Sequence, residues 1–137
     1  MVRTLETVYR TDMKKILIVD DSKAIRELVR ITLDPDAYEV LEADTGEAGV
    51  EAACGNHPDL IVMDVKMPGR MDGFEAINAI RAHQKLKGVP VIVLSGAGEP
   101  GCDEVRLFET GELLYFKKPF SPLDLIEKID EILGTAA

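Results

Sequence analysis

The feature that most limits the fold of this chain is a repeated alternation of short apolar runs with segments of helical periodicity. Five runs have the length and apolar composition of buried strands, at residues 16–19, 38–41, 60–63, 89–94 and 113–116. Between and after them, apolar residues recur every three or four positions, as on the buried face of a helix. Apolar strands that alternate with helices predict a parallel sheet covered by helices on both sides.

The helices expected in this pattern have recognisable ends. Apolar spacing places them at residues 24–33, 45–56, 73–86, around 105–108 and 121–133. Thr45 and Ser121 are residue types that cap helix N-termini, and Gly134 is suited to end the last helix. Residues 1–13 and 135–137 are interpreted as N- and C-terminal tails of a single domain that spans residues 14–134.

Length and charge narrow the class of protein. The chain has 137 residues, a common size for one domain, and a net charge of -9. Because nucleic acid is bound through a basic face, this acidic chain is not expected to bind it directly. No run is long and apolar enough for a membrane span or a signal peptide, and the cysteines have no metal-ligand spacing. We therefore expect a cytoplasmic protein with neither a membrane nor a nucleic-acid partner.

Polar side chains stand where the predicted strands end. Asp20 and Asp21 follow the first strand, Asp64 the third, Ser95 the fourth and Lys118 the fifth. Because the carboxyl ends of parallel strands share one edge of the sheet, these side chains are expected to meet there. Two carboxylates about 4 Å apart repel by roughly 4 kcal/mol at an effective dielectric of about 20, and a divalent cation relieves that repulsion. An all-oxygen set of ligands suits Mg²⁺.

The residues alone leave two interpretations of these strand ends. In one, the acidic turn before residue 24 serves only to cap the following helix. In the other, the edge is a reactive site, where a carboxylate beside a cation attacks phosphorus and forms an aspartyl phosphate. A lysine and a hydroxyl then bind the phosphoryl oxygens. Asp64, Lys118 and Ser95 supply these three groups.

Several sequence motifs together resemble one protein family. They are Ile16-Leu-Ile-Val-Asp-Asp21, Leu60-Ile-Val-Met-Asp-Val-Lys-Met-Pro68 with Met71-Asp-Gly73, Val91-Ile-Val-Leu-Ser95 and Lys118-Pro119-Phe120. In this order they resemble the receiver domain of bacterial two-component response regulators, whose single-domain prototype is the chemotaxis regulator. The resemblance covers about residues 14–134. It implies a flavodoxin-like, doubly wound α/β fold with five parallel strands in the order 2-1-3-4-5 and five helices on both faces.

The resemblance also implies which residues take up the phosphoryl group. Asp64 matches the phosphoacceptor. Asp20 and Asp21 match the acids that hold Mg²⁺ together with Asp64 and the backbone carbonyl of Lys66.

Three further positions match the part of the family site that responds to phosphorylation. Ser95 matches the hydroxyl that moves toward the phosphoryl group, and Lys118 matches the lysine that pairs with it. Tyr115 matches the aromatic residue that turns inward on activation. Pro119 is a candidate for a cis peptide bond, since the family's Lys-Pro bond is usually cis. The surface formed by the helix near 105–108, the strand at 113–116 and the last helix is expected to change on phosphorylation.

The sequence departs from the family pattern in the loop after Asp64. One residue usually separates the Met-Pro and Met-Asp-Gly motifs, whereas Gly69 and Arg70 stand here. The course of this loop is therefore open, and Arg70 is a candidate to lie at the mouth of the site. Lys66 adds a cation two residues after the acceptor.

Three functions are compatible with these residues. The first is a phosphorylation-dependent signalling switch that receives its phosphoryl group from a sensor histidine kinase or a phosphotransfer protein. It acts through an unidentified downstream protein, because no output domain is expected, and it is no enzyme beyond self-phosphorylation and autodephosphorylation. The second is a receiver-like binding module that is never phosphorylated. The third is a Mg²⁺-dependent phosphatase with an aspartyl nucleophile, but that class has its nucleophile on the first strand.

Overall fold

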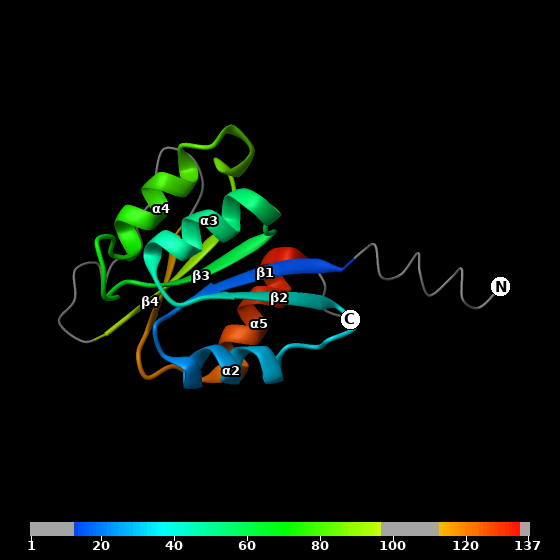
Figure 1. The fold of residues 1–137 in the computed structure, drawn as a ribbon. Coiled ribbons are helices and arrows are strands. Elements are labelled where there is room, and N and C mark those ends of the chain that lie inside the picture. Colours follow the sequence, from blue (N-terminus) through cyan, green and yellow to red (C-terminus); the bar gives the residue numbers. More distant parts are fainter. Residues whose placement is uncertain (1–12, 97–112, 135–137) are drawn as a thin grey trace.

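Five parallel strands form one sheet in a computed structural model of the chain, which describes residues 13–96 and 113–134 (Figure 1). The strand order is β2-β1-β3-β4-β5, and all of the pairings are parallel. The strands are β1 (Lys14–Val19), β2 (Tyr38–Ala43), β3 (Leu60–Asp64), β4 (Val91–Ser95) and β5 (Leu113–Lys117). The predicted sheet, its direction and its order are therefore confirmed.

Helices cover both faces of this sheet. Within the described residues they are α2 (Lys23–Thr32), α3 (Gly46–Asn56), α4 (Gly73–Arg81) and α5 (Pro122–Leu133), with a 3₁₀ turn, η1, at Gln84–Leu86. Figure 1 shows α3 and α4 on one face and α2 and α5 on the other. The helix expected around 105–108 lies outside the described residues. In the described ranges, no helix combines the length and apolar character that crossing a bilayer requires.

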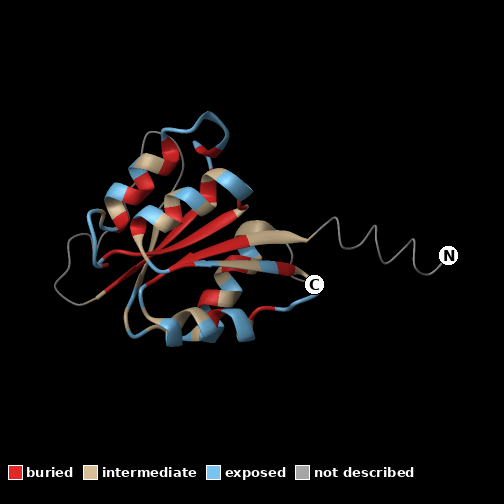
Figure 2. Cartoon of the chain, in the orientation of Figure 1, coloured by how far each residue is buried: buried red, intermediate tan, exposed pale blue. Residues whose placement is uncertain are grey.

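Two apolar layers form because successive side chains of a strand point to opposite faces of the sheet. In β1, Leu17 and Val19 pack toward α3 and α4, while Ile16 and Ile18 pack toward α2 and α5. Figure 2 shows the central strands buried along most of their length. Apolar runs without alternation were the sequence signal for this burial on both faces.

The predicted helix caps are present. The Thr45 side chain accepts a hydrogen bond from the backbone N–H of Ala48 at 3.0 Å, and Ser121 does the same for Asp124 at 3.3 Å. Gly134 follows α5 with φ of 67°, the left-handed conformation that glycine adopts most readily.

The prediction of one helix over residues 73–86 is wrong at its C-terminal end. The helix α4 ends at Arg81, and His83 is extended with ψ of 129° before the chain turns again in η1. Leu86 is nonetheless buried, which is why the apolar spacing continued past the end of the helix. The buried Arg81 side chain donates a hydrogen bond to the Lys87 carbonyl at 2.6 Å and so holds this turn against the helix.

One glycine permits the chain to return to the sheet at the start of α4. The Gly73 N–H donates to the Val65 carbonyl at 2.8 Å. A Cβ atom on Gly73 would lie 2.2 Å from the Asp64 carbonyl oxygen and 2.9 Å from the Val65 Cα. Both neighbours are backbone atoms of the strand end and its extension, so neither has a flexible side chain's freedom to move aside.

We predict that Gly73→Ala lowers the free energy of unfolding by about 3 kcal/mol, the upper part of the range for overpacked sites. Urea unfolding followed by circular dichroism measures this change. Gly55→Ala is the matched control, because a Cβ there meets no atom within 4 Å. Equal stabilities of the two variants would contradict the close approach at Gly73.

Candidate functional site

The site is built at the carboxyl edge of the sheet, where hydrogen bonds of the sheet continue one step past the strands. The Asp20 N–H donates to the Ala43 carbonyl at 3.0 Å, and the Lys118 N–H donates to the Ser95 carbonyl at 2.8 Å. Asp64 is the last residue of β3 and pairs in register with Leu94. The backbones that carry the polar residues are thus fixed by the sheet itself.

Three carboxylates come together at this edge. One oxygen each from Asp20, Asp21 and Asp64 lies within 4.8 Å of the others. Asp20 and Asp64 are buried, with 0% and 2% of their surface exposed, whereas Asp21 is exposed. The predicted clustering of these acids is therefore observed, and two of the three are removed from bulk water.

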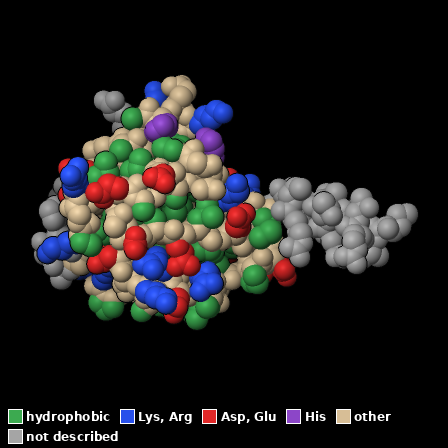
Figure 3. Space-filling view, in the orientation of Figure 1, with side chains coloured by type: hydrophobic (Ala, Val, Ile, Leu, Met, Phe, Trp, Pro, Cys, Tyr) green, Lys and Arg blue, Asp and Glu red, His purple; other side chains and the backbone are tan. Residues whose placement is uncertain are grey.

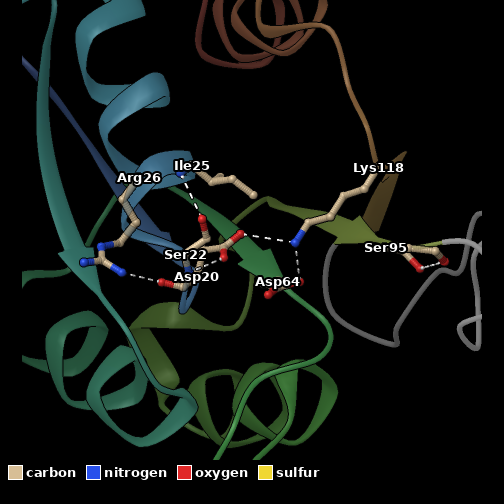
Figure 4. A network of polar contacts seen from close by, with 8 residues as sticks. Asp20, Ser22, Ile25, Arg26, Asp64, Ser95 and Lys118 are labelled. Atoms are coloured by element: carbon tan, nitrogen blue, oxygen red, sulfur yellow. Dashed lines mark hydrogen bonds and ion pairs between the residues drawn. The ribbon is translucent and has the colours of Figure 1, made fainter.

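Lys118 supplies positive charge to the cluster. Its Nζ atom lies 3.0 Å from Asp64 Oδ1 and 3.5 Å from Asp20 Oδ2. Figure 4 shows the lysine side chain reaching from the end of β5 across to both acids. Burial by itself would lower the pKa of Lys118, but the hydrogen bond to Asp64 and the charges of Asp20 and Asp64 outweigh it and leave the pKa raised.

One ammonium group does not compensate for the burial of the acids. Burial raises the pKa of Asp64 to about 6, even though the hydrogen bond from Lys118 lowers it and the charge of Asp20 raises it further. Burial likewise raises the pKa of Asp20, against the hydrogen bond from the Ser22 N–H. The negative charges at this edge are therefore destabilised in the absence of a further cation.

The donors at this edge fit a hard divalent cation such as Mg²⁺. Asp20 Oδ2 is buried and accepts no hydrogen bond from the described residues. Its free lone pairs, with the oxygens of Asp21 and Asp64, form a set of carboxylate donors of the kind that Mg²⁺ prefers. Bound Mg²⁺ would be held by these three side chains and would offset their mutual repulsion.

The acidic turn also caps a helix, so the two interpretations of it are compatible. The Ser22 hydroxyl accepts a hydrogen bond from the Ile25 N–H at 3.3 Å at the start of α2. Asp20 Oδ1 accepts the Ser22 N–H at 2.9 Å. Capping thus uses Ser22 and one oxygen of Asp20, and the other oxygen points into the cluster (Figure 4).

Sequence reasoning missed the arginine that holds this turn. Arg26 donates from Nη1 to the Asp20 carbonyl at 2.8 Å and from Nε to Glu42 at 3.0 Å. Arg30 also pairs with Glu42, at 3.3 Å. No motif marks Arg26, because it reads as one of several polar residues on a helix. Figure 3 shows acidic and basic side chains intermixed over the face of the molecule that it displays.

The remaining predicted residues lie near the cluster in different ways. Ser95 is buried at the end of β4, further along the edge than the contacts of Lys118 with the acids (Figure 4). Tyr115 is half-buried, and its ring lies against Phe74 with centroids 6.4 Å apart. The Lys118–Pro119 peptide bond is cis. Lys66 is exposed in the loop that follows β3.

Fold and site together define a class: an α/β domain with a carboxylate cluster and a lysine at the carboxyl edge of a parallel sheet. Residues 16–130 match the family described as the response regulator receiver domain. The chain therefore belongs to this family, whose members are regulatory phosphoacceptors and whose domains occur in two-component systems.

Similar proteins and structures agree with this assignment. The transcriptional regulatory protein ResD of Bacillus subtilis is 36% identical over 128 residues, which are 93% of this chain and 51% of that protein. The phosphate regulon transcriptional regulatory protein PhoB of Escherichia coli is 33% identical over 88% of this chain and 52% of its own length. The chain thus spans about half the length of these relatives. The chemotaxis response regulator CheY4 of Vibrio cholerae has a TM-score of 0.72 and 32% identity, over 88% of this chain and 98% of that one.

The raised pKa of Asp64 predicts how stability changes with pH when Mg²⁺ is absent. In the unfolded chain the pKa of an aspartate is about 3.9. Between about pH 4 and pH 6 the folded protein therefore binds more protons than the unfolded one, and its stability falls as the pH rises. Above that range the full cost of the buried charge is present.

We predict that Asp64→Asn stabilises the metal-free protein at pH 7.5 by on the order of 2 kcal/mol and that this gain disappears near pH 4. Urea unfolding in EDTA at a series of pH values measures both. Asp36→Asn, at an exposed position, is the control and is expected to show no such dependence. Destabilisation by Asp64→Asn at pH 7.5 would contradict the prediction.

Proposed function

We propose that this protein is a phosphorylation-dependent signalling switch with Asp64 as its phosphoacceptor. The observation that carries the proposal is the contact of the buried Asp64 carboxylate with Lys118 at 3.0 Å, beside Asp20 and Asp21. A carboxylate nucleophile, an ammonium group and an oxygen-donor site for a cation are the parts that phosphoryl transfer to aspartate needs.

In this mechanism, a carboxylate oxygen of Asp64 attacks the phosphorus atom of the donor. A new P–O bond forms as the bond from phosphorus to the donor breaks, and the product is an aspartyl phosphate. Lys118 is already in contact with the attacking carboxylate and stabilises the negative charge of the transferred group. Mg²⁺, held by Asp20, Asp21, Asp64 and the backbone carbonyl of Lys66, supplies charge neutralisation at the phosphoryl oxygens.

Phosphorylation is proposed to be communicated through Ser95 and Tyr115. The Ser95 hydroxyl, at the end of β4, moves to bind the phosphoryl group, and Lys118 exchanges its contact with Asp64 for one with a phosphoryl oxygen. Tyr115 lies on the neighbouring strand and packs against Phe74, so its ring is the element that changes position. The surface around β5 and α5 then binds its partner in an altered form.

The partners follow from this chemistry. A sensor histidine kinase or a histidine phosphotransfer protein donates the phosphoryl group, and a downstream protein, not nucleic acid, binds the switched surface. A single domain over residues 14–134 with short tails and a location in the cytoplasm belong to the same proposal. Self-phosphorylation from small phosphodonors and autodephosphorylation are its sole reactions.

We predict that incubation with acetyl phosphate and Mg²⁺ adds one phosphoryl group to the protein, seen by intact-mass spectrometry. Asp64→Ala is expected to abolish the adduct because it removes the nucleophile, and Asp36→Ala is expected to keep it. An adduct that is absent from the wild-type protein, with Mg²⁺ bound, would instead support a binding module that acts without phosphorylation. Catalytic turnover of many phosphoesters would support the phosphatase.

A further inference from the structure

The loop that leaves the phosphoacceptor is held in its middle by a helix from elsewhere in the chain. This loop runs over residues 65–72 and contains the two residues, Gly69 and Arg70, that depart from the usual spacing. The Arg70 N–H donates a hydrogen bond to Glu47 Oε2 at 3.2 Å. Glu47 belongs to the first turn of α3, 23 positions earlier in the sequence.

Gly69 makes this contact possible. Its φ of +105° lies in the region that residues with side chains rarely adopt. A Cβ atom on Gly69 would lie 3.3 Å from Glu47 Oε1, so the carboxylate rests directly on the glycine backbone. The extra residue of the loop is thus accommodated by a glycine turn that closes over the Glu47 carboxylate.

The same helix turn touches the loop at a second point. A Cβ on Gly46 would lie 2.8 Å from Met71 Cβ and 2.9 Å from the Met71 carbonyl oxygen. The backbone of α3 therefore packs on the loop with no side chain between them. Gly46 and Glu47 are adjacent in the sequence and hold adjacent parts of the loop.

The ends of the loop are fixed separately. At the end of the loop, the Gly73 N–H bonds to the Val65 carbonyl. Asp72 and Glu75 form a reciprocal cap at the start of α4. Glu47 is therefore the charged anchor between these ends, on the segment that begins beside Asp64 and carries Lys66.

A role for Glu47 in its own helix does not account for this arrangement. An acidic residue in the first turn is favourable to the helix dipole wherever its carboxylate points. Here the carboxylate accepts an N–H from outside the helix and lies against the Gly69 backbone. Its contacts serve the loop rather than the helix.

We propose that Glu47 is a positioning residue for the phosphoacceptor site, which holds the loop over residues 65–72 in the arrangement that binds Mg²⁺ and protects the phosphoryl group. The part concerning the phosphoryl group rests on the function proposed above. Without the carboxylate, the glycine turn samples other conformations, and apparent affinity at the site falls with the fraction of the competent one.

The experiment compares Glu47→Ala, Glu47→Gln and Glu51→Ala with the wild-type protein. Glutamine keeps a side-chain oxygen that accepts the Arg70 N–H but removes the charge. Glu51 is exposed on the same helix and controls for the loss of an acidic side chain. Amide hydrogen exchange over residues 65–72, Mg²⁺ affinity by calorimetry and the lifetime of the acetyl phosphate adduct are measured for each.

For Glu47→Ala we expect faster exchange at residues 69–71, about three- to tenfold weaker Mg²⁺ binding and a shorter adduct lifetime. Glu47→Gln is expected to restore all three to near the wild-type values, and Glu51→Ala to leave them unchanged. A loss of overall stability without a change in Mg²⁺ affinity would overturn the proposal, as would a glutamine variant as impaired as the alanine variant.

The outcomes separate this inference from the proposed function. Hydrogen exchange and Mg²⁺ affinity test the anchor whether or not Asp64 accepts a phosphoryl group. If the wild-type protein takes up no phosphoryl group, the proposed function fails while these two measurements still decide the role of Glu47. If the adduct forms normally but Glu47→Ala alters neither exchange nor affinity, the inference alone fails.

Discussion

The site depends on the contact of Lys118 with two carboxylates that are buried at the end of an apolar sheet. Removing charges from water is costly, and such charges persist where a partner of opposite sign is close by. Lys118 is brought to Asp64 and Asp20 by the pairing of β4 with β5, and its own backbone is bonded to Ser95. The order and register of the strands therefore decide the chemistry of the edge, because they place residues from four separate segments within reach of one another.

Much of this arrangement follows from local sequence patterns. The strands were predictable because runs such as 60–63 are apolar on both faces, and Thr45 and Ser121 marked helix starts by side-chain chemistry alone. The meeting of Asp20, Asp21, Asp64 and Lys118 followed from one topological rule, that parallel strands end at a common edge. The end of α4 did not follow, since Leu86 keeps the apolar spacing while the backbone at His83 leaves the helix.

The contacts that sequence patterns did not reveal are those between elements. Arg26 holds the Asp20 carbonyl, and Glu47 holds the Arg70 N–H, through backbone groups that any residue possesses. No residue type at the receiving position signals such a bond. The close approach of Gly73 to Asp64 is equally silent, because the glycine is required by a neighbouring carbonyl rather than by a left-handed backbone. The three-dimensional arrangement was needed to find each of them.

The raised pKa of Asp64 sets function against durability in this domain. Selection or design for heat resistance favours substitutions that relieve buried charge, and amides at the acidic edge are such substitutions. The residues that such a procedure would replace first are those that the proposed switch requires. An engineered variant that is unusually robust deserves inspection at this edge before its signalling is trusted, and the stabilising changes should be sought in the surface helices instead.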